Sequence, residues 1–179
     1  AIEQIKKEGG LIFEFTPPEI NYNGFRKILD VDMKKDLPKY LNKYSKNSIK
    51  NIKEIIDFNI EDSLKRAPYG QGIFKSIALN NTTDLEISEI KSRIKLEGKR
   101  YFDEAINKYD LDAVLSINNY HASYAAGAYY PCLTVPMGYR ESGVPSNLTF
   151  IGPSYSEEKL YQLGYAFEKE TNKRVSPFN

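Results

Sequence analysis

The sequence predicts an α/β fold in which a mixed β-sheet is flanked by helices. Three short apolar runs rich in β-branched residues indicate strands, at Leu111–Ile117, Cys132–Tyr139 and Asn147–Ile151. Turn-forming residues at Arg140–Gly143 join the last two runs, so these two strands should pair as an antiparallel hairpin. Helical patterns precede and follow the three runs, and such alternation is typical of layered α/β structures. The hairpin favours a mixed sheet over a purely parallel one.

The first residues predict a helix followed by a strand. Ala1–Glu8 has the pattern of the end of a helix, and the pair Gly9-Gly10 should stop it. The apolar run Leu11–Phe15 predicts a buried strand, and the two prolines in Thr16–Glu19 then open the next element.

A helical region follows. Apolar residues recur at helical spacing over Ile20–Tyr44, which favours an amphipathic helix that Pro38 should break or kink. The same spacing recurs over Asn51–Leu64, and Arg66–Gly72 has the composition of a loop. A short helix is predicted over Gly72–Asn80.

The longest predicted helix begins near Thr83 and runs to about Tyr109. Thr83 and Glu86 have the spacing of a capping box, in which each side chain satisfies a free backbone N–H of the other residue. A last helix is predicted over Ser156–Thr171, directly after the third strand.

Length and composition set the scale and exclude several classes of function. A chain of 179 residues with 41% hydrophobic residues is expected to form one or at most two compact units. The formal net charge is +1 and no face-long basic stripe is visible, so nucleic-acid binding is not expected. No apolar run approaches the roughly 20 residues needed to cross a bilayer, so no membrane association is expected.

Cysteine and histidine are each present once. The single Cys132 cannot form an internal disulfide, and its apolar strand predicts an inert thiol in the core. One histidine and one cysteine do not supply the ligand spacing of a zinc site. No metal or other cofactor is therefore expected.

The pattern S-x-x-K, which places a lysine base one turn beyond a serine nucleophile, occurs three times. All three pairs fall on charged helical segments, where the side chains are expected to face water, so no catalytic role is assigned to them. The pairs are Ser88 with Lys91, Ser92 with Lys95, and Ser156 with Lys159.

The end of the chain resembles the C-terminal end of amidase-signature enzymes. These enzymes typically end with a strand closing on Ser-Pro, a small-residue run, a Thr-Val-Pro-x-Gly strand, a Gly-x-Pro turn, a Phe-x-Gly strand and a helix containing Tyr-Ala-Phe-Glu. The matching pieces here are Ser116 with Ile117, Ala126–Pro131, Thr134–Gly138, Gly143–Pro145, Phe150–Gly152 and Tyr165–Glu168.

The resemblance implies that residues 1–179 form a single C-terminal subdomain of an amidase-signature α/β/α fold. The family carries its chemistry in a Gly/Ser-rich segment that holds a serine nucleophile and a second serine in a cis peptide, with a lysine upstream. No such segment is found in this sequence. The catalytic N-terminal part is therefore expected to be absent, and the chain is expected to be inactive alone.

The connector from Ser116 to Pro131 is the candidate substrate-binding segment. It follows the C-terminal end of a strand, where α/β proteins place ligand sites, and it combines polar residues with small ones. In the amidase-signature family the matching connector borders the substrate funnel. The resemblance thus points to four candidate pocket residues, Asn118, Tyr120, His121 and Tyr124. The structural alternative is that Asn118 and Asn119 cap a turn, His121 is a hydrogen-bonded loop histidine and the tyrosines serve in packing.

The function implied is that of an amidase that hydrolyses carboxamides through a serine acyl-enzyme, with this portion shaping the substrate pocket. Its expected partners are a small-molecule amide, the missing N-terminal catalytic half and, through a bared sheet edge, further copies of itself. One alternative is the amidotransferase A-type subunit that forms Gln-tRNA, and another is a non-catalytic binding domain derived from the fold. A cytoplasmic location is expected.

Overall fold

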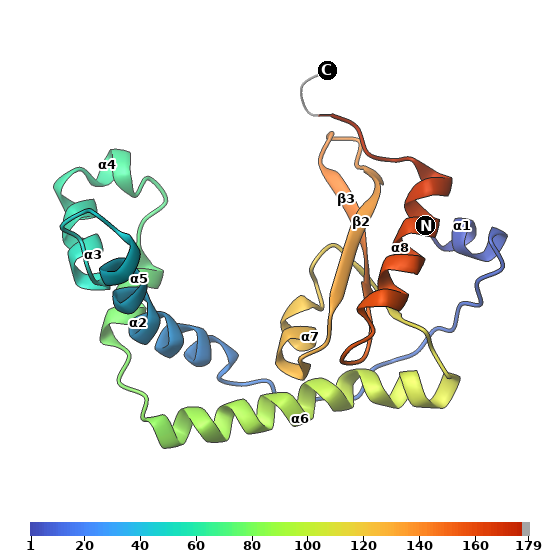
Figure 1. The fold of residues 1–179 in the computed structure, drawn as a ribbon, viewed down its shortest axis with the longest axis horizontal. Coiled ribbons are helices and arrows are strands. Elements are labelled where there is room, and N and C mark those ends of the chain that lie inside the picture. The colour runs from blue at the N-terminus through green and yellow to red at the C-terminus, as the bar shows by residue number, and fades with distance from the viewer. Residues whose placement is uncertain (177–179) are drawn as a thin grey trace. The chain divides into compact units, whose positions relative to one another are not determined.

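The computed structural model describes residues 1–176 and confirms the α/β class (Figure 1). The helices are α1 (Ile2–Lys7), α2 (Phe25–Tyr44), α3 (Ile52–Glu61), α4 (Ser63–Arg66), α5 (Gly72–Leu79), α6 (Asp84–Tyr109), α7 (Ala122–Ala128) and α8 (Glu157–Thr171). The strands are β1 (Val114–Ile117), β2 (Cys132–Tyr139) and β3 (Pro145–Ile151).

The chain divides into two compact units. The sheet unit contains residues 1–22 and the chain from Ile94 onward, and the helical unit is Asn23–Arg93. The boundary falls inside α6, so the C-terminal part of that helix belongs to the sheet unit. The expectation that 1–179 forms a single subdomain stays a prediction.

The sheet has the order β1-β3-β2, with both neighbouring pairs antiparallel. A mixed sheet would also contain parallel strands, but within residues 1–176 both strand pairs are antiparallel. The hairpin between β2 and β3 is confirmed, and its turn is closed by the Arg140 N–H, which donates to the Val144 carbonyl at 2.9 Å. The register between β2 and β3 shifts between Pro136 and Gly138, where the proline has no N–H to donate to the ladder.

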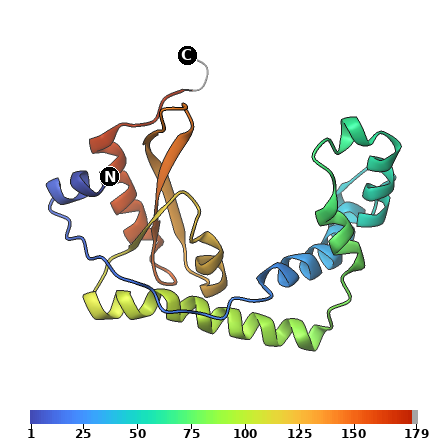
Figure 2. The same ribbon diagram turned by 180° about the vertical axis from the view of Figure 1, so that it is seen from behind.

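Helices cover both faces of the sheet (Figures 1 and 2). One core cluster joins α6, α7 and the sheet, and comprises Phe102, Val114, Ala125, Ala128, Tyr130 and Ile151. The other joins α8 to the opposite face, and comprises Val135, Leu148, Phe150, Leu160 and Phe167. The alternation of side chains along β3 explains this arrangement, since Phe150 and Ile151 point to opposite faces.

The predicted strand at Leu11–Phe15 is wrong. These residues have no strand assignment, Leu11 is 82% exposed and Phe13 is 45% exposed. A strand requires a neighbour to satisfy its backbone groups, and within residues 1–176 no strand pairs with this segment. The apolar pattern is present, but the pairing partner that it needs is not among the described residues.

The helical unit follows the predicted order of elements. The Asn51 side chain caps α3 by accepting from the Glu54 N–H at 3.0 Å. Half of the predicted capping box is present, since Thr83 Oγ1 accepts from the Glu86 N–H at 3.2 Å. Of the two outcomes predicted for Pro38, a break or a kink, the break is wrong, because α2 continues through that residue.

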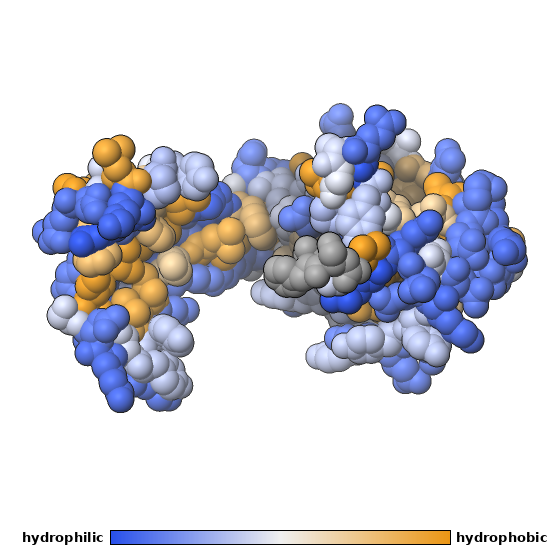
Figure 3. Space-filling model, turned by 90° about the horizontal axis from the view of Figure 1, so that it is seen from above, coloured by the Kyte–Doolittle hydropathy of each residue, from blue (hydrophilic) through white to orange (hydrophobic). Residues whose placement is uncertain are grey.

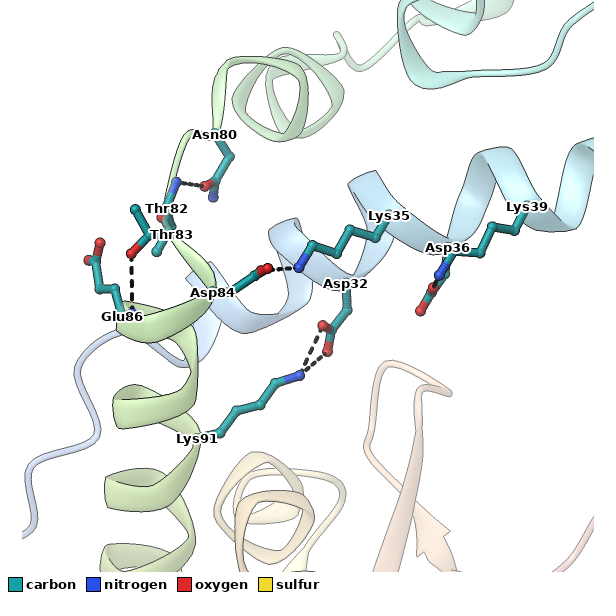
Figure 4. A network of polar contacts seen from close by, with 10 residues as sticks. All are labelled: Asp32, Lys35, Asp36, Lys39, Asn80, Thr82, Thr83, Asp84, Glu86 and Lys91. Carbon is teal, nitrogen blue, oxygen red and sulfur yellow. Dashed lines mark hydrogen bonds and ion pairs between the residues drawn. The ribbon is translucent and has the colours of Figure 1, made fainter.

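Ion pairs connect α2 to the start of α6 within the helical unit (Figure 4). Lys91 Nζ lies 3.0 Å from Asp32 Oδ1, and Lys35 pairs with Asp84. These side chains are largely exposed, so solvent screening keeps the contribution of each pair to stability small. Figure 3 shows apolar residues gathered among the helices of this unit. Its exposed large apolar side chains include Leu29, Met33, Phe58, Ile60, Leu64, Ile73 and Leu79.

Candidate functional site

The centre of the candidate site is a hydrogen bond between Ser116 and His121. Ser116 lies on β1 opposite Thr149, on the sheet face that carries α6 and α7. The chain turns sharply after β1, and His121 occupies the N-cap position of α7. This short return places Ser116 Oγ 2.7 Å from His121 Nδ1.

Three tyrosines from separate parts of the chain surround this pair. The Tyr101 ring on α6 lies 5.8 Å from the His121 ring and 4.7 Å from that of Tyr124, measured between centroids. The Tyr22 ring meets Tyr124 edge-on at 4.7 Å, and its hydroxyl donates to the Ser123 carbonyl at 2.5 Å. We call Tyr22, Tyr101, Ser116, His121 and Tyr124 the His121 cluster.

Burial controls the ionisation of the cluster. It lowers the pKa of His121 from its ordinary value, so the imidazole is neutral near pH 7. Burial also raises the pKa of Tyr22 to about 12 and, together with Tyr124, raises the pKa of Tyr101. At neutral pH the cluster is therefore an uncharged aromatic wall with a few polar atoms, which suits the binding of a neutral ligand.

A serine beside a histidine suggests a nucleophile and its base, but Ser116 does not fit that role. Ser116 is only 4% exposed, whereas a nucleophile needs an accessible hydroxyl. The hydrogen bond instead orients the imidazole ring.

Asn118 has a structural task in this arrangement. Its backbone has φ of 51°, a left-handed conformation that asparagine adopts more readily than most residues. The Asn118 N–H donates to the Asn147 carbonyl at 2.9 Å, and the Asn118 side-chain oxygen accepts from the Asn147 N–H at 2.9 Å. Its carbonyl also accepts from the Thr149 hydroxyl. The residue thereby ties the end of β1 to β3.

The four candidate pocket residues are thus divided. His121 and Tyr124 lie together in the His121 cluster, whereas Asn118 is engaged with β3. Tyr120 is 64% exposed. Their assignment to a substrate pocket stays a prediction.

Sequence reasoning missed two members of the cluster. Tyr101 stands in the middle of a long helix and Tyr22 precedes the helical unit, so their meeting with Tyr124 depends on tertiary folding. Ser116 was used only as part of a family motif, although its place at a strand end one turn before His121 is a local signal.

The lysines of the three S-x-x-K patterns have other partners. Lys91 pairs with Asp32, and Lys159 pairs with Asp112 at 3.0 Å. Lys95 lies over the Tyr129 ring, 5.0 Å from its centroid. Among residues 1–176 no group of three metal-binding side chains is present, and no helix is long and apolar enough to cross a membrane.

The prediction that Cys132 lies in the core is wrong. The residue is exposed, because β2 is the edge strand of the sheet rather than its centre. Its surroundings still raise the pKa of the thiol through partial burial, which keeps it weakly nucleophilic at neutral pH.

A large groove lies along the free edge of β1, within the sheet unit. Its volume is about 1170 Å³. We call it the edge groove; its lining includes Ile2, Ile5, Leu11, Phe13, Leu115, Ile117, Met137, Leu148, Phe150 and Leu163. The extended segment Leu11–Phe15 and strand β1 both contribute to this predominantly apolar lining.

The chain is similar in sequence to known amidases and to an amidotransferase subunit. No family model matches the chain. The chain is 26% identical over 185 residues to a probable amidase of Arabidopsis thaliana, covering 98% of this chain and 36% of the relative. It is 50% identical over 42 residues to the A-type subunit of the glutamyl-tRNA(Gln) amidotransferase of Streptococcus suis, covering 24% of this chain and 8% of the relative.

Solved structures of amidases also match nearly the whole chain. An amidase family protein from Bacillus anthracis matches with a TM-score of 0.84 and 29% identity, over 99% of this chain and 36% of that protein. A peptide amidase from Stenotrophomonas maltophilia matches with a TM-score of 0.82 and 26% identity, over 98% of this chain and 40% of that protein.

The homologues of this chain are amidases, which confirms the resemblance inferred from its sequence. The chain spans little more than a third of the length of the amidases to which it is related. This is consistent with the C-terminal portion of an amidase-signature protein.

Proposed function

We propose that this chain is the C-terminal portion of an amidase that hydrolyses carboxamide bonds through a serine acyl-enzyme. In this proposal the chain shapes the substrate pocket, and the nucleophile and its lysine belong to the remainder of the enzyme. The supporting observation is that nearly the whole chain superposes on amidases while it accounts for only 36–40% of their lengths.

The chemistry of the described residues supports inactivity of the chain alone. An acyl-enzyme needs an accessible hydroxyl whose proton passes to a neighbouring base. Ser116 has a neighbouring base but is buried, and the lysines of the S-x-x-K patterns have other partners.

The edge groove is where we expect the catalytic portion of the enzyme to pack against this chain. Asn118 and Asn147 are joined by a ladder bond, so the antiparallel alternation directs the backbone groups of Leu115 away from β3. Within residues 1–176 no strand pairs with that outer edge. We infer that a strand of the catalytic portion pairs with β1 there and covers the apolar lining of the groove.

Reconstitution tests this function. The coding sequence upstream of Ala1 is to be read from the gene and the segment it encodes expressed together with this chain. The proposal expects a Gly/Ser-rich segment with two serines and an upstream lysine, and amide hydrolysis only when both parts are present. A natural start codon immediately before Ala1, with no separately encoded catalytic partner, would support the non-catalytic binding domain instead.

The amidotransferase is the second candidate, favoured by the 50% identity over 42 residues to the Streptococcus suis protein. That match covers only 24% of the chain, whereas the amidases match nearly all of it, so the hydrolase is preferred. The reconstituted protein distinguishes them: release of ammonia from glutamine that depends on Glu-tRNA(Gln) identifies the amidotransferase.

A cytoplasmic location belongs to the same proposal. Fractionation of cells that express the natural gene tests it, and recovery of the protein outside the cytoplasmic fraction would contradict it.

A further inference from the structure

The Ser116 hydroxyl has a single hydrogen, and the structure offers one place for it. Among the described residues its hydrogen-bond partner is His121 Nδ1, at 2.7 Å. If Ser116 accepted a proton from Nδ1, its own hydrogen would be buried without an acceptor, which costs roughly 1–3 kcal/mol. If it donates to Nδ1, the hydroxyl hydrogen has its acceptor, and the remaining imidazole hydrogen lies on Nε2, which is not buried. The second arrangement is therefore the favourable one.

This arrangement determines where the histidine carries its proton. A neutral imidazole has one N–H and one bare nitrogen, so an accepting Nδ1 requires the proton on Nε2. The ring is flanked by Tyr101 of α6 and Tyr124 of α7. No carboxylate or cation among the described residues pairs with it, so nothing there favours the imidazolium.

The other ring nitrogen is available to a ligand. His121 is only partly buried, and among the described residues Nε2 has no hydrogen-bond partner, while buried polar atoms without one are confined to Ser156 Oγ. Nε2 is thus accessible and unoccupied by protein groups. A proton at this atom makes it a donor of fixed direction, because the ring is held by Ser116 and by the two tyrosines.

We propose that Ser116 is a positioning residue that holds His121 as the Nε2–H tautomer, so that the candidate pocket presents a neutral N–H donor to a carbonyl oxygen. A donor without charge suits a neutral carboxamide better than a carboxylate, which would prefer a cation. The assignment of this carbonyl to the part of an amide substrate that lies along the pocket wall, away from the bond that is cleaved, rests on the proposed function. The tautomer does not, because it is a property of this chain alone.

The test uses nitrogen-15 NMR of the intact chain, in which His121 is the only histidine. Long-range proton–nitrogen correlation spectra above the pKa distinguish the bare nitrogen from the protonated one by chemical shift. The proposal expects one dominant tautomer with Nε2 protonated. A dominant Nδ1–H tautomer, or a mixture like that of free histidine, would overturn it.

Two variants separate positioning from simple packing. Ser116→Ala removes the donor to the neutral ring, so the tautomers should mix and the pKa of His121 should rise. Ser116→Thr keeps a hydroxyl and should restore both the single tautomer and the low pKa. An unchanged tautomer in a folded Ser116→Ala variant would contradict the proposal.

The proposed function can fail separately. If reconstitution gives no amidase activity while the Nε2–H tautomer is found, the amide assignment is wrong and the positioning role of Ser116 remains. If activity is restored but the tautomer is Nδ1–H, the proposed function stands and the positioning role of Ser116 is wrong. Because the wild-type spectrum alone decides the tautomer, the test survives even if Ser116→Ala does not fold.

Discussion

Gly98 of α6 lies directly against the backbone of Tyr124 in α7. A Cβ atom at position 98 would stand 2.8 Å from the Tyr124 carbonyl oxygen and 2.9 Å from the Ala128 nitrogen. Position 127 on α7 is also restricted, since a Cβ there would stand 2.7 Å from Ile94 Cγ2 of α6 and 1.9 Å from the Tyr22 hydroxyl. The close approach of these two helices, made possible by glycine on each, brings Tyr101 to the rings of Tyr124 and His121.

Replacing Gly98 with alanine is expected to destabilise the chain. Helix propensity alone would favour alanine by roughly 1 kcal/mol. The atoms in the way belong to backbone and cannot rotate aside, so overpacking of about 1–3 kcal/mol should exceed that gain. Urea unfolding of Gly98→Ala measures the difference.

Gly72→Ala is the matched control. It is also a helical glycine, but a Cβ there has nothing within 4 Å. It should be neutral or slightly stabilising. Equal stability of Gly98→Ala and Gly72→Ala would show that the helices can separate at little cost.

The titration of His121 should appear in the stability of the fold. Because its pKa is lowered in the folded state, the unfolded chain binds the proton more readily below about pH 6.5. Its contribution to the free energy of unfolding is therefore fully present above pH 6.5 and is lost as the pH falls through the folded pKa. The difference between wild type and His121→Gln isolates this contribution from that of the carboxylates. The stability advantage of wild type over His121→Gln should shrink as the pH falls. An advantage that grows with falling pH would contradict a lowered pKa of His121 in the folded state.

The free sheet edge should cause self-association. Burying a few hundred Å² of the edge groove lining, at roughly 25 cal/mol per Å², favours association by several kcal/mol before entropic costs. Ile117→Lys places a charge on β1, which discourages pairing of sheet edges. Sedimentation should show concentration-dependent association of the wild type that this variant reduces.

Ile73→Lys provides the comparison, because Ile73 is exposed to a similar extent but lies on α5 of the helical unit. It should leave the association unchanged. A monomeric chain at high concentration that binds no hydrophobic dye would instead identify a self-sufficient domain.

In an intact enzyme the connector should control substrate choice. His121→Ala and Tyr120→Ala should raise KM and alter amide preference while leaving a small, unbranched amide nearly unaffected, because a pocket wall binds ground and transition states alike. The expected loss is about 1–3 kcal/mol, or roughly ten- to two-hundred-fold in kcat/KM for substrates that touch the wall. Thermal unfolding of the same variants is the control, since early unfolding or an equal loss for all substrates would make the connector structural.

The sequence predicted what depends on local pattern. The bounds of β2 are those read from its β-branched run, and the Arg140–Gly143 turn, α5 and the Thr83 cap were each visible in a few adjacent residues. The strand at Leu11–Phe15 failed because strand formation also requires a neighbour, which a pattern within one segment does not reveal. Cys132 was misplaced for a related reason, since an apolar strand has the same composition at the edge of a sheet as at its centre.

The candidate site was only partly predictable. The connector could be located because it follows a strand and is rich in small residues. Its grouping with Tyr22 and Tyr101 could not, because these residues lie far away in sequence and meet only through the packing of α6 against α7. The sequence also did not reveal that the Asn118 side-chain oxygen accepts from the Asn147 N–H, and the assignment of Asn118 to a pocket stays a prediction.

The central claim is that this chain contributes the pocket but not the nucleophile of an amidase, and active-site labelling tests it most directly. The purified chain is incubated with an activated fluorophosphonate, its intact mass is measured, and hydrolysis of aryl amides is followed in parallel. The account predicts no mass increase and no hydrolysis above background. Stoichiometric labelling of any serine in this chain would contradict it.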